Sequence, residues 1–501
     1  MARYKKVKFI FHILMSDYLL TIGLEIHMKL KSINKMFCQC KNEQNFDMLL
    51  PNTNICPVCT GQPGALPTLS KEVLDKALIL GKALNCEINT VSRFDRKSYF
   101  YPDLPMGYQI TQLYTPTNVK GQIKFFLENY TQEKMVHILD AHMECDTAKM
   151  IHDGWQALID FNRAGTPLVE IVTGPDFSSP EEVTEFLKEL QRIVRYNDIA
   201  DADMEKWQMR VDVNISVRKN ESDPLGTRVE VKNVNSFGAI RRVIDFEYAR
   251  QVELYEKWEK FTQETRKRDD AEGKSSPMRS KEEALDYRYF PEPDLPPLVI
   301  SNETMKRLNK QTLEIPHEII KKMKEEWWFN KEYINALIGD KEMLDYFLDA
   351  LSSWAQSKDI GTTAKTVAKW LVGPIAAWMK ENFKTVNQLT VNSEQFRKFL
   401  TIAQEGKLME SQMKIVMDEM LATGKDADAI IAEKGFEAVE IDASELESIV
   451  QTVLDEHAPT VALYKWGKTT TLWFFVGQVM KKTWGKLSPK VIGEVVEKLL
   501  G

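Results

Sequence analysis

Hydrophobic and polar residues alternate strictly along residues 19–30, LLTIGLEIHMKL. A period of two is typical of a β-strand with one buried face. The polar face of this strand carries a glycine, a carboxylate and an imidazole at Gly23, Glu25 and His27. A solvated sheet face would explain any one of them, so the combination directs attention to the polar faces of other strands.

Further alternation and capping signals predict an α+β fold. Segments rich in β-branched residues with a period of two predict strands at 135–146, 166–172, 209–218 and 227–235. Serine caps and helical periodicity predict helices over 70–85 and 178–196. After a proline-rich segment at 286–301 the strand patterns nearly disappear, and amphipathic helices with polar turns follow.

This change of pattern predicts a β-rich part followed by helical parts. The expected divisions are an N-terminal extension at 1–16, a β-rich domain at 17–295, a helical domain at 296–405 and a helical tail at 406–501.

The polar faces of the predicted strands carry the residues most suited to chemistry. Alternation along 135–146 places on one face Val136, Ile138, Asp140, His142 and Glu144. Glu170 is the only charged residue of 166–172, and an unpaired buried carboxylate is costly. The polar faces of the next two strands carry Arg210, Asp212, Asn214, Ser216, Arg218, Arg228, Glu230 and Lys232.

If these strands share one sheet, carboxylates, an imidazole and cations converge on one basin. This mixture suits Mg²⁺ held against phosphate oxygens. The predicted Mg²⁺ ligands are Glu25, His27, Glu144 and Glu170. The candidates for binding a phosphate-bearing cofactor are Arg210, Asp212, Asn214 and Lys232.

Four of the six cysteines form two close pairs. Cys38 and Cys40 are followed, after fifteen residues, by Cys56 and Cys59. In a large chain without an export signal, this spacing predicts one structural Zn²⁺ held by four thiolates. Four unrelated buried cysteines are the alternative.

Composition narrows the class of protein. The net charge of −7 over 501 residues argues against indiscriminate nucleic-acid binding, but a local basic face could still bind one RNA. No apolar run is long enough to cross a bilayer. The first fifteen residues are basic and then apolar without a cleavage pattern, and an extended start before Met15 is the favoured interpretation, so a cytoplasmic location is expected. No serine or cysteine nucleophile motif is present, so any ammonia or acyl intermediate must come from another chain.

Long segments of the chain resemble the B subunits of aspartyl/glutamyl-tRNA amidotransferases. The resemblance runs from about residue 17 to the end and is carried by IGLEIHMKL, KMFCQC, PNTNICPVCTGQPGALPTLS, SRFDRKSYFYPDLPMGYQITQ, AHMECDTAKMIHDG, DFNRAGTPLVEIV, VEVKNVNSF and MRSKEEALDYRYFPEPDLPPL. It implies a cradle-shaped catalytic domain, a helical domain and a helical tail that binds tRNA.

The same resemblance implies an activity and its partners. In this family, ATP and Mg²⁺ phosphorylate the side-chain carboxylate of Glu-tRNA(Gln) or Asp-tRNA(Asn). Ammonia from the amidase A subunit then displaces phosphate, and a small C subunit holds A and B together. The family's metal site maps to Glu25, His27, Glu144 and Glu170. A non-catalytic tRNA-binding module and a ligase using free ammonia are the alternatives.

Some positions depart from the family pattern or suggest further roles. Cys145 stands where the family has an acid, and Trp207 replaces a flexible residue. Gly23 is a candidate for leaving room for a substrate. A cluster suited to RNA backbone contacts is expected at Lys481, Lys482, Trp484, Lys486 and Lys490.

Overall fold

The computed structural model describes residues 17–500, except 128, 270–273, 281–286, 353–358, 406–407, 437–442 and 484–488. The chain divides into two compact units, Met1–Glu318 and Ile319–Gly501. The expected extension at 1–16 and the positions Trp484 and Lys486 lie outside the described residues.

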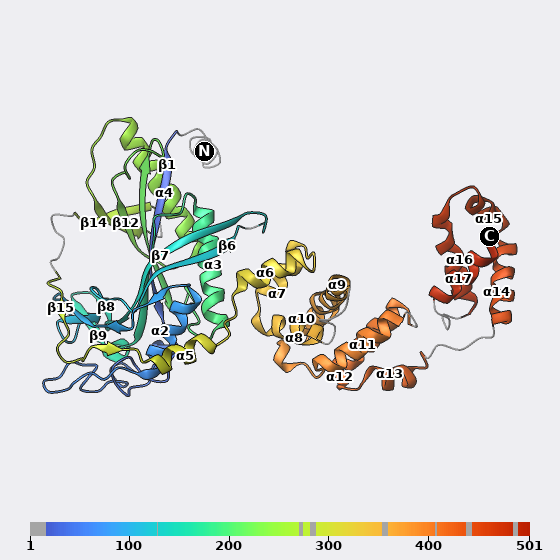
Figure 1. Ribbon diagram of the computed structural model, residues 1–501, viewed down its shortest axis with the longest axis horizontal. Coiled ribbons are helices and arrows are strands. Elements are labelled where there is room, and N and C mark those ends of the chain that lie inside the picture. Colours follow the sequence, from blue (N-terminus) through green and yellow to red (C-terminus); the bar gives the residue numbers. More distant parts are fainter. Residues whose placement is uncertain are drawn as a thin grey trace. The chain divides into compact units, whose positions relative to one another are not determined.

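A nine-stranded sheet forms the frame of the first unit, in the order β14-β13-β12-β11-β1-β10-β7-β6-β2. Its strands β1, β6, β7, β12 and β14 are labelled in Figure 1. Its strands are β1 (Leu19–Lys29), β2 (Glu87–Ile88), β6 (Asn118–Phe126), β7 (Glu133–Cys145), β10 (Pro167–Thr173), β11 (Met209–Arg218), β12 (Val229–Val234), β13 (Glu264–Asp269) and β14 (Lys274–Ser280). β1 pairs antiparallel with both β10 and β11, so the strand of the LLTIGLEIHMKL segment lies in the interior of the sheet.

Three helices cover the apolar face of this sheet: α2 (Lys71–Ala83), α3 (Pro180–Tyr196) and α4 (Phe237–Glu256). The apolar residues of β1 and β11 are buried in the core that these helices complete, as the alternation predicts. The side chain of Ser179 accepts a hydrogen bond from the backbone N–H of Glu182 and so caps α3. The opposite face of the sheet keeps the polar residues.

Smaller sheets are built by the remaining strands. β4 (Asp95–Ser98) pairs with β5 (Tyr108–Thr111) and β15 (Phe290–Pro291), and β3 (Val91–Ser92) pairs with β16 (Leu298–Val299). β8 (Lys149–Asp153) and β9 (Gln156–Asp160) form a hairpin. The proline-rich segment therefore pairs back onto the first unit, which continues through α5 (Asn302–Lys310) to Glu318.

β7 contains a β-bulge that inverts its alternation. Val136 and Ile138 were expected on the polar face, and this prediction is wrong, because both lie in the core. The pairing with β10 shifts by one residue at Leu139, and beyond it Ala141 and Met143 lie in the core instead. An extra residue in one strand reverses the face on which each later side chain lies. The bulge brings the second half of β7 into the register that the polar face requires.

The elements described in the second unit are all helical. They are α6 (Pro316–Glu325, which begins in the first unit), α7 (Lys331–Ile338), α8 (Lys341–Ser352), α9 (Ile360–Trp370), η4 (Leu371–Ile375), α10 (Ala376–Glu381), η5 (Val386–Gln388), α11 (Ser393–Glu405), α12 (Glu410–Thr423), α13 (Ala427–Lys434), α14 (Ala443–Glu456), α15 (Ala458–Lys465), η6 (Thr469–Thr471), α16 (Leu472–Lys482) and α17 (Pro489–Leu500). α14, α16 and α17 share a separate apolar core that includes Val450, Phe475 and Val496. Among the described residues, no helix combines the length and apolar character needed to cross a bilayer. The predicted α+β class, with a sheet-rich part before a helical part, is confirmed.

Two strand glycines in this sheet offer a matched test of packing. A Cβ on Gly121 would lie 2.4 Å from Cys86 Sγ and 2.7 Å from the Leu84 carbonyl oxygen, whereas a Cβ on Gly23 would meet its nearest atom, in Pro175, at 3.6 Å. We expect Gly121→Ala to lower the free energy of unfolding by about 1–3 kcal/mol, because overpacking forces the backbone to move. Gly23→Ala should leave the thermal midpoint nearly unchanged. Equal destabilisation of the two variants would contradict this.

Candidate active site

Four residues distant in sequence form a row across the polar face of the sheet. In the registers of β11, β1, β10 and β7, Arg210 lies opposite His27, His27 opposite Glu170, and Glu170 opposite His142. Directly paired residues on one face of antiparallel strands have their side chains in contact range. A guanidinium, an imidazole, a carboxylate and a second imidazole therefore follow one another along one line across the sheet.

His27 is surrounded by the three predicted carboxylate ligands. Its Nε2 lies 3.3 Å from Glu170 Oε2, 3.4 Å from Glu144 Oε1 and 3.9 Å from Glu25 Oε1. Glu144 is almost fully buried, and His27 and Glu170 are largely buried. The four residues predicted to hold Mg²⁺ thus lie together around one imidazole.

The ligand atoms fall into two overlapping groups. His27, Glu144 and Glu170 can each place one ligand atom within 4.8 Å of the others, and Glu25, His27 and Asp212 can do the same. Asp212 was expected to contact a cofactor and was absent from the predicted metal set. Carboxylate oxygens with one imidazole nitrogen form a donor set that a hard divalent cation accepts. The residues present therefore fit Mg²⁺, and Asp212 joins the ligands that could hold it.

Glu170 is held ionised by the two imidazoles beside it. Burial alone would raise the pKa of Glu170, but hydrogen bonding to His142 and His27 and their charge hold this pKa well below its ordinary value. Burial would also lower the pKa of His142, but Asp140, whose Oδ1 lies 2.7 Å from His142 Nδ1, and Glu170 raise it to about 10. This corner of the site is a fixed arrangement of charges.

The carboxyl group of Glu25, unlike that of Glu170, has a raised pKa. Its burial, followed by repulsion from Glu170, raises the pKa of Glu25 to about 7, although Lys232 and His27 act against the rise. A carboxyl group with an elevated pKa is stabilised in its ionised form by any cation that binds next to it. Glu25 is therefore the ligand whose charge depends most on a bound metal.

A further cation near the row was missed by sequence reasoning. Lys97 of β4 is half-buried. Its desolvation would lower the pKa of its ammonium, but Glu144, Tyr289 and Glu170 raise it. Its Nζ lies 5.0 Å from the centre of the Tyr287 ring. β4 belongs to a different sheet, so the alternation of the main strands could not indicate Lys97. Its place in the segment SRFDRKSYFYPDLPMGYQITQ, which carries part of the family resemblance, was the available signal.

The four predicted cofactor-binding residues lie in different surroundings. Lys232 Nζ lies 2.6 Å from Asp212 Oδ2, so these two are paired with each other. Asn214 lies opposite Gly23, further along β1. Arg210 lines a separate cavity of about 380 Å³, and none of the other three lines that cavity.

The four paired cysteines form the second cluster that could hold a metal. One Sγ atom from each of Cys38, Cys40, Cys56 and Cys59 lies within 4.8 Å of the others. A hydrogen bond from Cys38 and the ammonium of Lys35, 3.7 Å away, lower the pKa of Cys59 to about 5 although its burial acts against this. Thiolate is the form that binds zinc, so the donor set is compatible with structural Zn²⁺.

Comparison with known proteins identifies the family of the chain. A family model described as the GatB/GatE catalytic domain matches residues 20–306, and one described as the GatB domain matches residues 354–500. The chain is 40% identical to the B subunit of the aspartyl/glutamyl-tRNA(Asn/Gln) amidotransferase of Persephonella marina, covering 96% of this chain and 98% of that protein. It is also 40% identical to the corresponding protein of Clostridium beijerinckii and 38% identical to that of Carboxydothermus hydrogenoformans, with 96% of this chain and 98% of the relative covered in each case. The chain belongs to the B-subunit family of aspartyl/glutamyl-tRNA amidotransferases.

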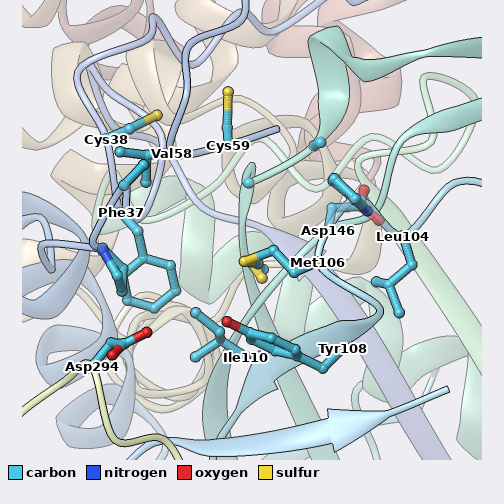
Figure 2. Close-up of a pocket in the computed structure, with 16 residues that line it drawn as sticks. Phe37, Cys38, Val58, Cys59, Leu104, Met106, Tyr108, Ile110, Asp146 and Asp294 are labelled. Atoms are coloured by element: carbon cyan, nitrogen blue, oxygen red, sulfur yellow. The ribbon is translucent and has the colours of Figure 1, made fainter. Parts of the chain in front are cut away.

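Cys145, at the position where the resemblance described above leads us to expect an acid, lies on the opposite side of β7 from Glu144. It is buried in the core, and burial raises the pKa of its thiol to about 12. Its side chain lines a cavity of about 40 Å³ that extends from Cys38 and Cys59 to Tyr108 (Figure 2). That volume admits water but is far below the size of a nucleotide site. Cys145 therefore belongs to the core behind the polar face of the sheet, and Glu144 lies beside His27 on that face.

The cysteine cluster gives a direct test of metal content. We expect purified chain to contain about one Zn²⁺ per molecule, and Cys56→Ser to lose it and unfold at lower temperature, because a structural metal contributes its binding energy to folding. Elemental analysis and thermal unfolding measure the two effects. Cys86→Ser, outside the cluster, is the control and should retain the metal. A zinc-free wild-type chain of full stability would contradict the assignment.

Proposed function

We propose that this chain is the ATP-dependent catalytic subunit that converts Glu-tRNA(Gln), Asp-tRNA(Asn) or both into the corresponding amides. The observation that carries the proposal is the group of Glu144, Glu170 and Glu25 around His27, within 4 Å of its Nε2, in a chain of the amidotransferase B-subunit family. A non-catalytic tRNA-binding module would have no use for three partly desolvated carboxylates at one imidazole.

The reaction needs a good leaving group on the acyl carbon. A carboxylate oxygen of the aminoacyl side chain attacks the γ-phosphorus of ATP, and the bond from that phosphorus to the ADP oxygen breaks. Ammonia then attacks the carbonyl carbon of the acyl phosphate, inorganic phosphate leaves, and the nitrogen loses one proton. Most of the protein's contribution to such chemistry is alignment and neutralisation of charge.

Different residues would contribute to holding the metal and to neutralising charge. Mg²⁺, when bound, supplies positive charge against the transferring phosphoryl oxygens. Glu25, His27, Glu144 and Glu170 would hold it, with Asp212 beside Glu25. Lys97 adds a half-buried positive charge that interacts with Glu144 and Glu170, so anionic oxygens entering the basin meet a further cation.

Ammonia and tRNA involve other surfaces and chains. The chain carries no recognised nucleophile motif for hydrolysing glutamine, and the relatives are named as B subunits. We therefore propose a cytoplasmic heterotrimer in which an amidase A subunit supplies ammonia and a small C subunit joins A to B. Comparing glutamine with free ammonium, with and without the A subunit, separates this assembly from a self-sufficient ligase.

A test of the metal assignment is Glu170→Gln in that complex. The change keeps the size of the side chain and removes the charge that two imidazoles hold in place. Amidation and tRNA-dependent ATP hydrolysis should fall together, on the order of 10²-fold or more, because lost electrostatic stabilisation is poorly replaced by water. Affinity for tRNA should barely change, and the glutaminase activity of the complex should persist at least in part.

Glu87→Gln is the matched control. Glu87 lies on β2 at the edge of the same sheet and forms an exposed ion pair with Lys120, so its variant should amidate at the wild-type rate. Amidation by Glu170→Gln at the normal rate and low Mg²⁺ concentration would contradict the metal assignment.

A separate prediction concerns the helical tail. Lys481 and Lys482 end α16, and Lys482 Nζ lies 2.5 Å from Glu456 while Lys481 is exposed. Deleting 443–501 removes the core shared by α14, α16 and α17 in full. This deletion should weaken tRNA binding by at least about tenfold, because phosphate contacts dominate affinity for nucleic acids. The first unit should stay folded.

A pair of charge reversals locates the contact. Lys481→Glu should weaken tRNA binding most at low salt. Lys369→Glu, on α9 outside the tail, is the control and should leave tRNA binding unchanged. Filter binding over a salt series measures both, and unchanged affinity in the deletion variant would refute a tRNA-binding tail.

A further inference from the structure

Lys35 is a charged side chain enclosed in the interior of the first unit. Its exposed fraction is 0%, although lysine is one of the residues most rarely buried in full. A buried ammonium is costly unless an anion and hydrogen-bond acceptors compensate for the water that it has lost. The groups that surround Lys35 must therefore supply that compensation.

The ammonium of Lys35 has a neutral partner and a sulfur partner. It donates a hydrogen bond to the carbonyl oxygen of Asn54, at 2.9 Å, and one to Cys59 Sγ, at 3.7 Å. Among the described residues, no carboxylate forms an ion pair with this ammonium. The sulfur of Cys59, in its thiolate form, is therefore the anion that balances the buried charge.

Lys35 contacts both halves of the cysteine cluster. Its backbone N–H donates to the carbonyl oxygen of Cys40 at 2.8 Å, which attaches its main chain to the first pair of cysteines. Its side chain reaches the second pair at Cys59 and at Asn54. The backbone of Gly165 covers this contact, since a Cβ there would lie 3.4 Å from Cys59 Cβ and 3.7 Å from Lys35 Cδ. These contacts fix the ammonium beside the sulfur.

A metal site built from four thiolates has an excess of negative charge. Four thiolates around one Zn²⁺ leave two negative charges uncancelled, and Cys59 is buried, where water can do little to stabilise them. A cation next to one sulfur lowers the electrostatic energy of the loaded site. It also lowers the energy of the non-bonding electrons of that sulfur, from which the absorption band of a metal–thiolate bond arises.

We propose that the ammonium of Lys35 is the countercharge of the metal centre and increases its affinity for Zn²⁺. Lys35 acts through the Cys59 sulfur and is not itself a ligand. The proposal rests on the predicted zinc site and is independent of the amidation reaction. A lysine in the interior and a metal site with excess negative charge compensate each other.

The test compares Zn²⁺ binding by the full-length chain and two lysine variants. Lys35→Met keeps an unbranched side chain and removes the charge. Its dissociation constant for Zn²⁺, measured by competition with a chromogenic chelator, should rise about 10–100-fold, the usual loss when a group that supports a metal ligand is removed. Lys41→Met is the matched control, because Lys41 directly follows Cys40 but is exposed and pairs with Glu43 at 2.7 Å. Its constant should stay within about twofold of the wild type, since an exposed charge is screened.

Cobalt substitution separates the effect of charge from that of packing. In Lys35→Met, the sulfur-to-cobalt absorption band should shift to longer wavelength, because the sulfur electrons lose the nearby cation. A purely structural role would lower the affinity without moving the band. Lys35→Gln, which can still donate to the Asn54 carbonyl oxygen, should show the same shift, and it replaces Lys35→Met if that variant does not fold.

Several results would overturn the proposal. They are an unmoved band, an unchanged Zn²⁺ constant in Lys35→Met, and an equal loss of affinity in Lys41→Met. Failure of both Lys35 variants to fold, while Lys41→Met loads metal normally, would also overturn it, because Lys35 would then serve the fold and not the charge of the site. A wild-type chain that binds neither Zn²⁺ nor Co²⁺ would refute the metal assignment and the proposal together. The proposed amidation is tested separately, by Glu170→Gln.

Discussion

The antiparallel register of β1 with β10 and β11 is the constraint on which the site depends. It sets His27 between Glu170 and Arg210. A slip of one residue would turn Glu25 and His27 into the core and Ile26 out of it. The apolar face of β1 makes that slip costly, since its residues are buried beneath the helices. The hydrophobic core thereby fixes the positions of polar groups that contribute nothing to it.

Keeping so much charge on a partly covered face requires compensation. Carboxylates at Glu144 and Glu170 are tolerated because His27, His142 and Lys97 lie near them. Removing one partner from such a group leaves an uncompensated charge, which costs more than the pair contributes. The same arrangement is prepared for a cation, because Glu25, whose pKa is raised to about 7, still lacks full neutralisation.

The loop that carries the cysteines also bears on the site. It supplies Phe46 beneath Lys29 in the larger cavity and Phe37 in the smaller one. Long loops with few apolar contacts are poorly ordered unless they are cross-linked. Four thiolates around one metal would fix this loop, and with it one wall of the cavity beside Arg210. A structural metal would in this way support a cavity that it does not touch.

The sequence by itself determined which residues share a face. Alternation in β1 and β11 separated apolar from polar positions correctly, because a strand's side chains follow a period of two wherever one face is buried. The spacing of the cysteines is likewise a local feature of the sequence. The four thiols that it groups lie close together, each with its Sγ atom within 4.8 Å of the others. Alternation failed at Leu139, where a bulge inverts β7; no local residue signals a bulge of this kind, which depends on the neighbouring strand.

Only the tertiary structure decided which polar residues meet. Asp212 joins Glu25 and pairs with Lys232, whereas Arg210, two positions away on the same strand face, lines a separate cavity. Lys97 arrives from another sheet. Such groupings depend on strand order and register, which are set by contacts between separate segments, among them β1 with the distant strands β10 and β11. A periodic pattern records the environment of each side chain, and the identity of its neighbours is left to the packing of the whole domain.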